Sequence, residues 1–384
     1  MLLSVDYENQ DKVFESAFSI LADAIASHAF PAASIAVTKA GRLIARKAFG
    51  TFVYEGDAVA RSLAQLHRHA AGYEVTPATL FDLASVTKAV ATTTMAAILY
   101  ERGLLELDAP ISGIVPEFLS LGASDRDSRR NSVTFRMLLA HSSGLPAYEK
   151  LFLKTRTSEE LLHAAFTLPL TADPGTRAEY SDIGFIILGV ALERLAEESL
   201  DVFCQREIFG PLAMSATTYN PPADLRPKIP PTADDRTFRH RVIQGEVQDE
   251  NASVLGGVAG HAGLFSTAED VARFAVAMTT SSGASTTTAI RPETISLFTR
   301  REASPSGTSR ALGWDTPSAP SQSGKYFGRR AYGHLGYTGT SLWIDPEREL
   351  SITLLTNRTW PDCTNQSIKQ VRPRFHDAVI EALR

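Results

Sequence analysis

The spacing of apolar residues predicts helices near the start and through the middle of the chain. Within residues 11–28 the apolar positions recur at intervals of four, three and four, as on one face of an α-helix, at Phe14, Phe18, Leu21 and Ile25. A second helix is expected to open near Ser85 and to end at Gly103, which suits a C-cap. Between residues 104 and 245 the signals are mostly helical, with the strongest apolar period at 183–196.

Strand patterns lie at both ends of the chain. The β-rich runs 33–38 and 43–49 flank Ala40-Gly41, which predicts a hairpin. Near the C-terminus two more strand-like runs precede a final helix that begins at about residue 366, and they cover 341–344 and 350–356.

This order of elements favours one sheet built from both ends of the chain, with helices inserted between them. We therefore expect an α+β fold in which an antiparallel sheet is flanked by helices. The predicted α/β domain comprises residues 1–104 and 246–384, and the predicted insertion, a mainly helical domain, comprises residues 105–245.

Composition narrows the function classes. The 384 residues carry a formal net charge of -5, so no basic surface for nucleic acid and no polybasic membrane anchor are expected. The N-terminus lacks a signal-peptide pattern, and no apolar run is long enough to span a membrane, so the expected location is cytoplasmic. No residues have the spacing of a metal cluster, and no cofactor is expected.

A serine and a lysine three residues apart are the first candidate chemistry. On a helix, Ser85 and Lys88 would share one face, within reach of each other, and the helix N-terminus would favour negative charge developing at the serine. The motif alone is weak, because an exposed Ser and Lys on a helix is the commoner arrangement.

Two further segments are candidates for the same site only when they are considered together with Ser85 and Lys88. Tyr180-Ser181-Asp182 precedes the apolar helix, where a tyrosine is usually a packing residue. The glycine-rich segment from Gly333 to Thr340 precedes a strand, and its glycines would let a substrate lie along the strand edge and leave a backbone N–H free to donate.

Together these segments resemble the β-lactamase and penicillin-binding-protein-like serine hydrolases, particularly the branch with class C β-lactamases, D-aminopeptidases and class C-like esterases. The resemblance implies a β-lactamase/transpeptidase-like fold with Ser85 as the acylated nucleophile. The N–H groups of Ser85 and Tyr337 would form the oxyanion hole. Lys88 and Tyr180 would carry the serine proton, and the resemblance leaves open which of them is the base.

Two departures from the family pattern bear on the substrate. Asp182 stands where the family has an asparagine, and its carboxylate would keep Lys88 charged if it pointed inward. His334, followed by Gly336, stands where the family has a lysine, and a histidine is mostly neutral at pH 7. The anchor for an anionic β-lactam is therefore weakened.

The sequence thus predicts a serine hydrolase that is a carboxylesterase on small acyl esters, with weak or no β-lactamase activity. The first alternative is an amidase or D-aminopeptidase acting on muropeptide or D-amino-acid peptide fragments. The second is a catalytically silent relative that binds a ligand. His261 and Trp314 are further candidates for the walls of the substrate cleft.

Overall fold

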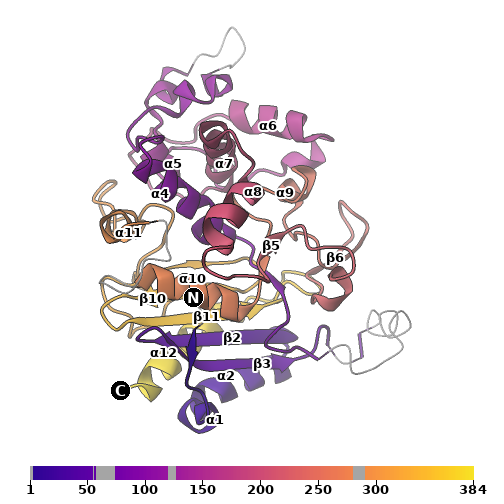
Figure 1. Cartoon of the computed structure of the whole chain (residues 1–384). Helices are drawn as coiled ribbons and strands as arrows, with labels where there is room; N and C mark the ends of the chain where they lie inside the picture. The colour runs from indigo at the N-terminus through magenta and orange to yellow at the C-terminus, as the bar shows by residue number, and fades with distance from the viewer. Residues whose placement is uncertain (1–2, 55, 58–73, 120–126, 280–289) are drawn as a thin grey trace.

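A six-stranded sheet built from both ends of the chain forms the lower half of the structure (Figure 1). The computed structural model describes residues 3–54, 56–57, 74–119, 127–279 and 290–384. The strand order is β1-β3-β2-β11-β10-β9, and every pairing is antiparallel except that of β1 with β3. The strands are β1 (Ser4–Val5), β2 (Ala32–Lys39), β3 (Arg42–Gly50), β9 (Tyr332–Leu335), β10 (Ser341–Asp345) and β11 (Leu350–Thr356).

The predicted hairpin is confirmed. Strands β2 and β3 pair from Ala32 opposite Gly50 to Lys39 opposite Arg42. Both residues of the connecting turn, Ala40 and Gly41, have positive φ angles, as the tight turns of hairpins require. Strand β2 is buried along nearly its whole length, which suits a central strand covered on both faces.

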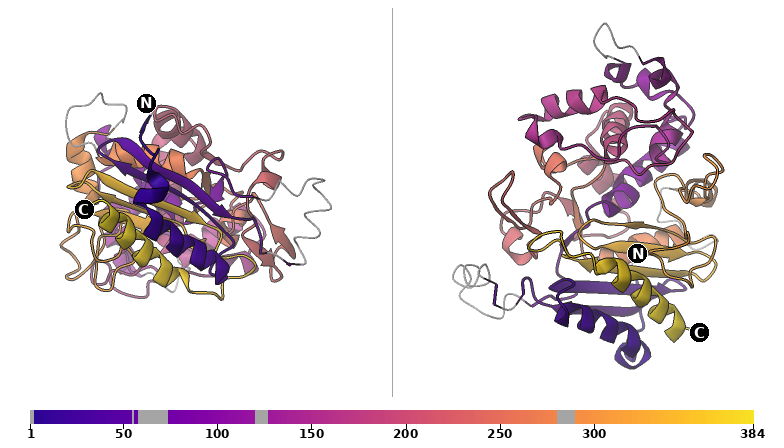
Figure 2. Two further views of the ribbon diagram at one scale, coloured as in Figure 1. Left: turned by 90° about the horizontal axis from the view of Figure 1, so that it is seen from below. Right: turned by 180° about the vertical axis from the view of Figure 1, so that it is seen from behind.

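Helices cover both faces of this sheet. Helices α2 (Glu15–Ala26) and α12 (Ile368–Ala382) lie side by side on one face (Figure 2), preceded by the short α1 (Gln10–Val13). Helix α10 (Ala268–Thr279) packs on β2, β10 and β11 from the other face. The strands alternate in direction of their side chains, so each face contributes to a separate apolar core.

The remaining helices form the upper half of the molecule in Figure 1. Helix α7 is buried from Ile183 to Gly189 and at Ala191 and Leu192, and α4, α5, α6 and α8 pack against it. The division of the chain into two domains stays a prediction. The bounds are α4 (Thr94–Glu101), α5 (Phe135–Leu139), α6 (Ser158–Thr167), α7 (Asp182–Ala196), α8 (Leu200–Cys204), α9 (Glu250–Val254) and α11 (Pro292–Thr299).

Two small sheets and several short helical segments connect the halves. Strands β4 (Phe81–Asp82) and β5 (Thr218–Tyr219) flank β8 (Leu264–Ser266). Within residues 104–245, where the signals are mostly helical, β6 (Ala233–Asp235) pairs with β7 (Arg241–Ile243) to form a short hairpin. The π-helical segments are η2 (Lys88–Thr93) and η7 (Gln205–Phe209), and the 3-10 segments are η3 (Ile111–Gly113), η4 (Pro116–Leu119), η5 (Ser128–Ser132), η6 (Leu151–Leu153) and η8 (Arg226–Lys228).

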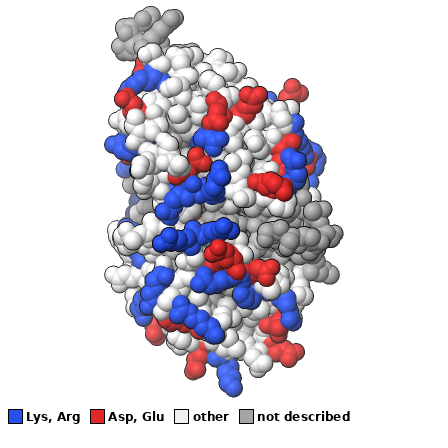
Figure 3. Space-filling model, turned by 90° about the vertical axis from the view of Figure 1, so that its left-hand side faces the viewer, with Lys and Arg blue, Asp and Glu red and all other residues white. Residues whose placement is uncertain are grey.

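Charged side chains of both signs share the surface. On the face shown in Figure 3, Lys and Arg side chains gather in a band across the middle of the molecule, with Asp and Glu side chains beside them. The expected absence of a nucleic-acid partner stays a prediction.

Candidate active site

Ser85 lies in a tight turn between strand β4 and the π-helical segment η2. Asp82 holds this turn, because its Oδ1 accepts the Ala84 N–H at 2.8 Å, while Leu83 N–H donates to Leu264 O at 2.9 Å. Ala84 has a φ of 46°, a left-handed conformation that costs a non-glycine residue on the order of 1 kcal/mol or more. The surrounding bonds fix this strained turn, and it presents Ser85 at the wall of a cavity.

Lys88 is fully buried directly beneath Ser85. Its ammonium donates to Ser85 Oγ at 2.9 Å, to Asp182 Oδ1 at 2.6 Å and to the backbone O of His261 at 2.9 Å, which uses all three N–H groups. Burial alone lowers the pKa of Lys88, but Asp182 and Tyr180 outweigh burial, and the net pKa is raised. The predicted contact of Ser85 with Lys88 is confirmed, and Asp182 points inward and keeps the lysine charged.

Tyr180 stands immediately before helix α7. Ser181 caps that helix by accepting the Gly184 N–H at 2.9 Å, and its own N–H donates to His141 Nδ1 at 3.0 Å. The buried His141 ring lies against the Tyr180 ring, with centroids 4.6 Å apart. His141 therefore fixes both the backbone and the ring at the start of α7.

The phenol of Tyr180 faces Lys88, whose Nζ lies 4.9 Å from the ring centroid. Burial raises the pKa of Tyr180 to about 12, although the cation of Lys88 acts in the opposite direction. At neutral pH the site therefore holds an ammonium and a neutral phenol beside Ser85.

His334 lies on β9, the edge strand of the large sheet. Its Nδ1 lies 2.8 Å from Leu335 O, so Nδ1 carries the proton and donates. Its Nε2 is buried and has no hydrogen-bond partner in the described part of the chain. Burial, together with the charge of Lys88, lowers the pKa of His334 to about 3. The residue in the family's lysine position is thus a neutral acceptor.

Gly336 and Tyr337 follow β9 in a turn that packs against the segment preceding Ser85. A Cβ on Gly336 would collide with Thr340 Oγ1 and with Leu83 O, so this close approach requires glycine. Among the described residues, neither the Ser85 N–H nor the Tyr337 N–H donates to a protein acceptor. Both N–H groups belong to residues that line the same cavity.

This cavity has a volume of about 720 Å³. Of the predicted site residues, it brings together Ser85, Tyr180, Asp182, His334, Gly336 and Tyr337, with Lys88 beneath them. Its walls carry charges of both signs, contributed by Lys150, Arg310, Arg358, Lys369 and Arg372 and by Asp182, Asp249, Glu250 and Asp315.

The two candidates for cleft walls lie elsewhere. His261 is buried behind the wall, where its Nε2 lies 2.9 Å from Asp249 Oδ1 while its backbone O binds Lys88. Trp314 is buried in the core, packed on Tyr332 and Phe274. The structure does not bring Trp314 to the cavity, because its side chain faces the interior between α10 and the sheet.

Several residues of the cavity wall escaped the sequence interpretation. Arg310 lies with its guanidinium carbon 5.4 Å from the Tyr180 ring centroid, and Arg358 and Arg372 are buried beside Tyr337. These arginines belong to no motif and reach the site only through tertiary folding.

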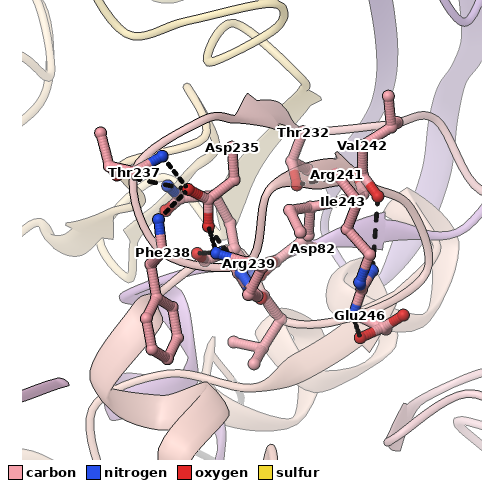
Figure 4. Close-up of polar contacts among 12 residues, drawn as sticks. Asp82, Thr232, Asp235, Thr237, Phe238, Arg239, Arg241, Val242, Ile243 and Glu246 are labelled. Atoms are coloured by element: carbon pink, nitrogen blue, oxygen red, sulfur yellow. Dashed lines mark hydrogen bonds and ion pairs between the residues drawn. The ribbon is translucent and has the colours of Figure 1, made fainter. Parts of the chain in front are cut away.

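The hairpin β6–β7 builds a further wall through a buried network (Figure 4). Asp235 accepts N–H bonds from Thr237, Phe238 and Arg239, and the Arg239 side chain pairs with it at 2.9 Å. Arg239 also donates to Val247 O and to Gln248 O, each at 2.7 Å.

The network reaches the nucleophile turn through Asp82. The Gln248 N–H donates to Asp82 Oδ2 at 2.7 Å, while the other oxygen of Asp82 holds Ala84. The hairpin, the segment preceding Asp249 and the turn of Ser85 therefore form one hydrogen-bonded unit.

The described residues include no group of three or more His, Cys, Asp or Glu side chains placed to hold a metal ion. None of their helices is both long and apolar enough to cross a membrane.

Comparison with known proteins gives the family. A family profile described as Beta-lactamase matches residues 18–368, most of the chain. The chain belongs to the beta-lactamase family. It is a serine hydrolase with the mixed α+β fold of this family.

Relatives within the beta-lactamase family carry different activities in their names. The chain is 33% identical to an N-acetylmuramyl-L-alanine amidase of Bacillus subtilis (strain 168) over 355 residues, which is 86% of this chain and 77% of that protein. It is 30% identical to a putative D-alanyl-D-alanine carboxypeptidase of Salmonella typhimurium over 365 residues, covering 88% of this chain and 81% of the other.

Solved structures share the fold at lower identity. EstCE1, a hydrolase with promiscuous acyltransferase activity, aligns with a TM-score of 0.74 and 20% identity, covering 96% of this chain and 99% of its own. A penicillin-binding protein homologue from Caulobacter crescentus aligns with a TM-score of 0.74 and 17% identity, covering 98% of each chain.

Proposed function

We propose that this serine hydrolase is an amidase that cleaves the bond between an N-acetylmuramyl group and L-alanine. The observation that carries the proposal is the cavity at Ser85, which has about 720 Å³ of space and walls of both charges. Pockets for apolar ligands are lined mostly by hydrophobic side chains, whereas these walls suit a polar substrate with a charged peptide portion. The 33% identity to the Bacillus subtilis amidase supports the same substrate class.

The carboxylesterase activity expected from the sequence remains the alternative to the proposed amidase activity. The neutral His334 favours it, because the family's permanent cation is missing there. The charged walls disfavour a small apolar acyl chain, since burying such a chain there would desolvate ionised groups without replacing their partners. Weak β-lactam hydrolysis follows from His334 under either proposal.

The proposed reaction proceeds through an acyl-enzyme. Ser85 Oγ bonds to the amide carbon, and the Ser85 proton passes to the Lys88–Tyr180 pair. The N–H groups of Ser85 and Tyr337 bind the oxygen that becomes negative. When the C–N bond breaks, the leaving amine takes the proton. Water then attacks the ester, the ester bond to Oγ breaks, and Ser85 regains a proton.

The resting protonation state limits the first step. Lys88 donates all three of its N–H groups, and Tyr180 is a neutral phenol, so neither group is prepared to accept a proton at neutral pH. Either base would gain its deprotonated form only as the pH rises. We expect kcat/KM to increase with pH from neutral to alkaline conditions.

The test is release of L-alanine from N-acetylmuramyl-L-alanine by the purified protein, run beside Ser85→Ala and p-nitrophenyl butyrate. Removing the nucleophile should lower the rate by about a thousandfold or more. The exposed Ser318→Ala serves as the matched control and should retain full activity. Ester turnover that depends on Ser85, without release of L-alanine, would instead support the carboxylesterase. Activity that survives Ser85→Ala would contradict both.

A further inference from the structure

The turn that carries Tyr337 rests on two buried arginines. Arg372 of helix α12 donates from Nη2 to Gly336 O at 2.8 Å and from Nε to Gly339 O at 3.0 Å. Arg358 donates from Nε to Tyr337 O at 2.7 Å. Each arginine is only 5% exposed. The carbonyl groups of the turn therefore point toward two guanidinium groups.

The planar peptide between Gly336 and Tyr337 fixes where its N–H points. In a trans peptide the C=O and N–H bonds are antiparallel, so a carbonyl directed at Arg372 sends the Tyr337 N–H the opposite way. On that side the turn is bonded to the strand preceding the nucleophile, because Thr338 Oγ1 donates to Asp82 O at 2.8 Å and Thr340 Oγ1 donates to Leu83 O at 3.0 Å.

The charge of Arg372 is not neutralised nearby. Within the described ranges no carboxylate forms an ion pair with Arg372 or Arg358, in contrast to Arg239 and Arg136. Among the described residues, the neighbouring charge that lowers the pKa of Arg372 is the cation of Arg358. A guanidinium on the carbonyl side of a peptide draws electron density toward the oxygen, which makes the N–H of the same peptide a stronger donor.

We propose that Arg372 is a positioning residue that orients and polarises the Gly336–Tyr337 peptide, so that the Tyr337 N–H stabilises the oxyanion. The inference rests on Ser85 being the nucleophile and on Tyr337 supplying an oxyanion donor, but it does not depend on whether the substrate is an amide or an ester. Arg358 holds the next peptide and the C-terminal segment through Cys363 O and Asn365 O, which is a separate anchoring contact.

The test measures reaction of Ser85 with a fluorophosphonate by intact mass. In this step the Ser85 Oγ–P bond forms, the P–F bond breaks, fluoride leaves, and the serine proton passes to the basic pair. The phosphoryl oxygen takes the place of the oxyanion. The variants are Arg372→Gln, which removes the charge, and Arg372→Lys, which keeps it. Arg374→Gln is the matched control, because Arg374 lies exposed on the same helix.

We expect Arg372→Gln to lower the maximal rate constant of phosphonylation about tenfold, a fraction of what loss of a whole oxyanion donor costs. Its half-saturating probe concentration should stay within about twofold of the wild type, because ground-state binding is unaffected. Arg372→Lys should recover part of the rate. Thermal unfolding of each variant identifies any that fail to fold, and Arg372→Lys keeps the test valid if Arg372→Gln is one of them.

Equal maximal rates in folded Arg372→Gln and Arg374→Gln would overturn the inference while leaving the proposed amidase intact. An equal loss in Arg372→Lys and Arg372→Gln would also overturn it, since charge would then have no effect. Failure of the wild type to react at Ser85 would remove the nucleophile assignment, and the inference with it. Normal phosphonylation without release of L-alanine would overturn only the amidase.

Discussion

At the scale of single residues, Asp182 distinguishes this site from the family pattern of Tyr-x-Asn. Its carboxylate lies 2.6 Å from Lys88 and raises the pKa of both Lys88 and Tyr180. An amide in the same place would accept a hydrogen bond without adding a negative charge. An aspartate at this position therefore stabilises the resting Lys88–Asp182 ion pair, and it makes Lys88 and Tyr180 harder to deprotonate.

Asp182→Asn should move the rising limb of kcat/KM to lower pH by about one unit or more, because a nearby carboxylate shifts a cation's pKa by that amount. The sign follows from removal of a negative charge, which lowers the pKa of either basic group. The measurement is a pH–rate profile, with Asp315→Asn, another carboxylate of the cavity wall, as control. If the rising limb of the pH–rate profile does not move in Asp182→Asn, Asp182 does not determine the pKa of the catalytic base.

The residues of the site were predictable where a local motif or the family resemblance marked them. Spacing placed Ser85 beside Lys88, and the inward orientation of Asp182 was anticipated as a condition. Arg310 and Arg372 come from distant segments with no local pattern. Their approach depends on long-range packing, which no periodicity encodes.

At the scale of elements, helix α7 and a second glycine-rich segment, the loop 256–263, approach each other closely. A Cβ on Gly260 would collide with Phe185 O and with the backbone of Gly189. The next residue of the loop, His261, supplies the backbone O that binds Lys88. The absence of side chains at this crossing therefore helps set the position of the Lys88 ammonium.

Gly260→Ala should destabilise the fold by about 1–3 kcal/mol, as overpacking typically does, and should also reduce kcat by displacing the loop from Lys88. Urea unfolding and steady-state kinetics measure the two effects. Gly113→Ala is the control, since a Cβ there would meet open space. An unchanged free energy of unfolding in Gly260→Ala would show that the loop can move away from helix α7 without destabilising the fold.

Arg239→Met should break the buried ion pair with Asp235. The Arg239 side chain is 8% exposed and that of Asp235 is 4% exposed, so the substitution should lower the free energy of unfolding by about 3 kcal/mol or more. Because Thr237 and Gln248 line the cavity, KM should rise more than kcat falls. The neighbouring Arg236→Met removes an exposed ion pair and should change little. Equal effects in the two variants would contradict a role for the hairpin in the cavity wall.

Elements with regular periods were predicted well, and irregular ones were not. The hairpin β2–β3, the C-terminal strands and helix α7 follow their patterns closely. The hairpin β6–β7 was missed because its strands are three residues long and its stability comes from Asp235 and Arg239 instead of an alternating apolar face. Short polar strands carry little signal in a sequence.

At the scale of the whole molecule, burial of histidines links stability to pH. His376 of α12 is fully buried, and burial, together with Arg372, lowers its pKa to about 3. A depressed histidine pKa means that the unfolded chain binds more protons below pH 6.5. The contribution is therefore complete above about pH 6.5 and is lost as the pH falls toward 3.

Between pH 7 and pH 5 this group alone should cost about 2 kcal/mol of unfolding free energy. In His376→Gln, which cannot ionise, the loss over the same interval should be smaller by that amount. Urea unfolding at the two pH values measures it, and the exposed His28→Gln should behave as the wild type does. An unchanged loss in His376→Gln would show that His376 is not the group being titrated.

The sheet that joins both ends of the chain has a consequence for biosynthesis. Ala33 pairs with Thr356, so the middle of the sheet consists of contacts between residues more than three hundred positions apart. Such a topology folds slowly, because bringing the two ends together costs chain entropy before the strand pairing can stabilise the fold. A ribosome making this chain releases β2 early and β11 almost last, and until then one edge of β2 stays unpaired and prone to aggregation. A premature stop shortly before β11 would therefore leave the sheet without its central pairing, although Ser85, Lys88, Tyr180 and His334 would already have been made.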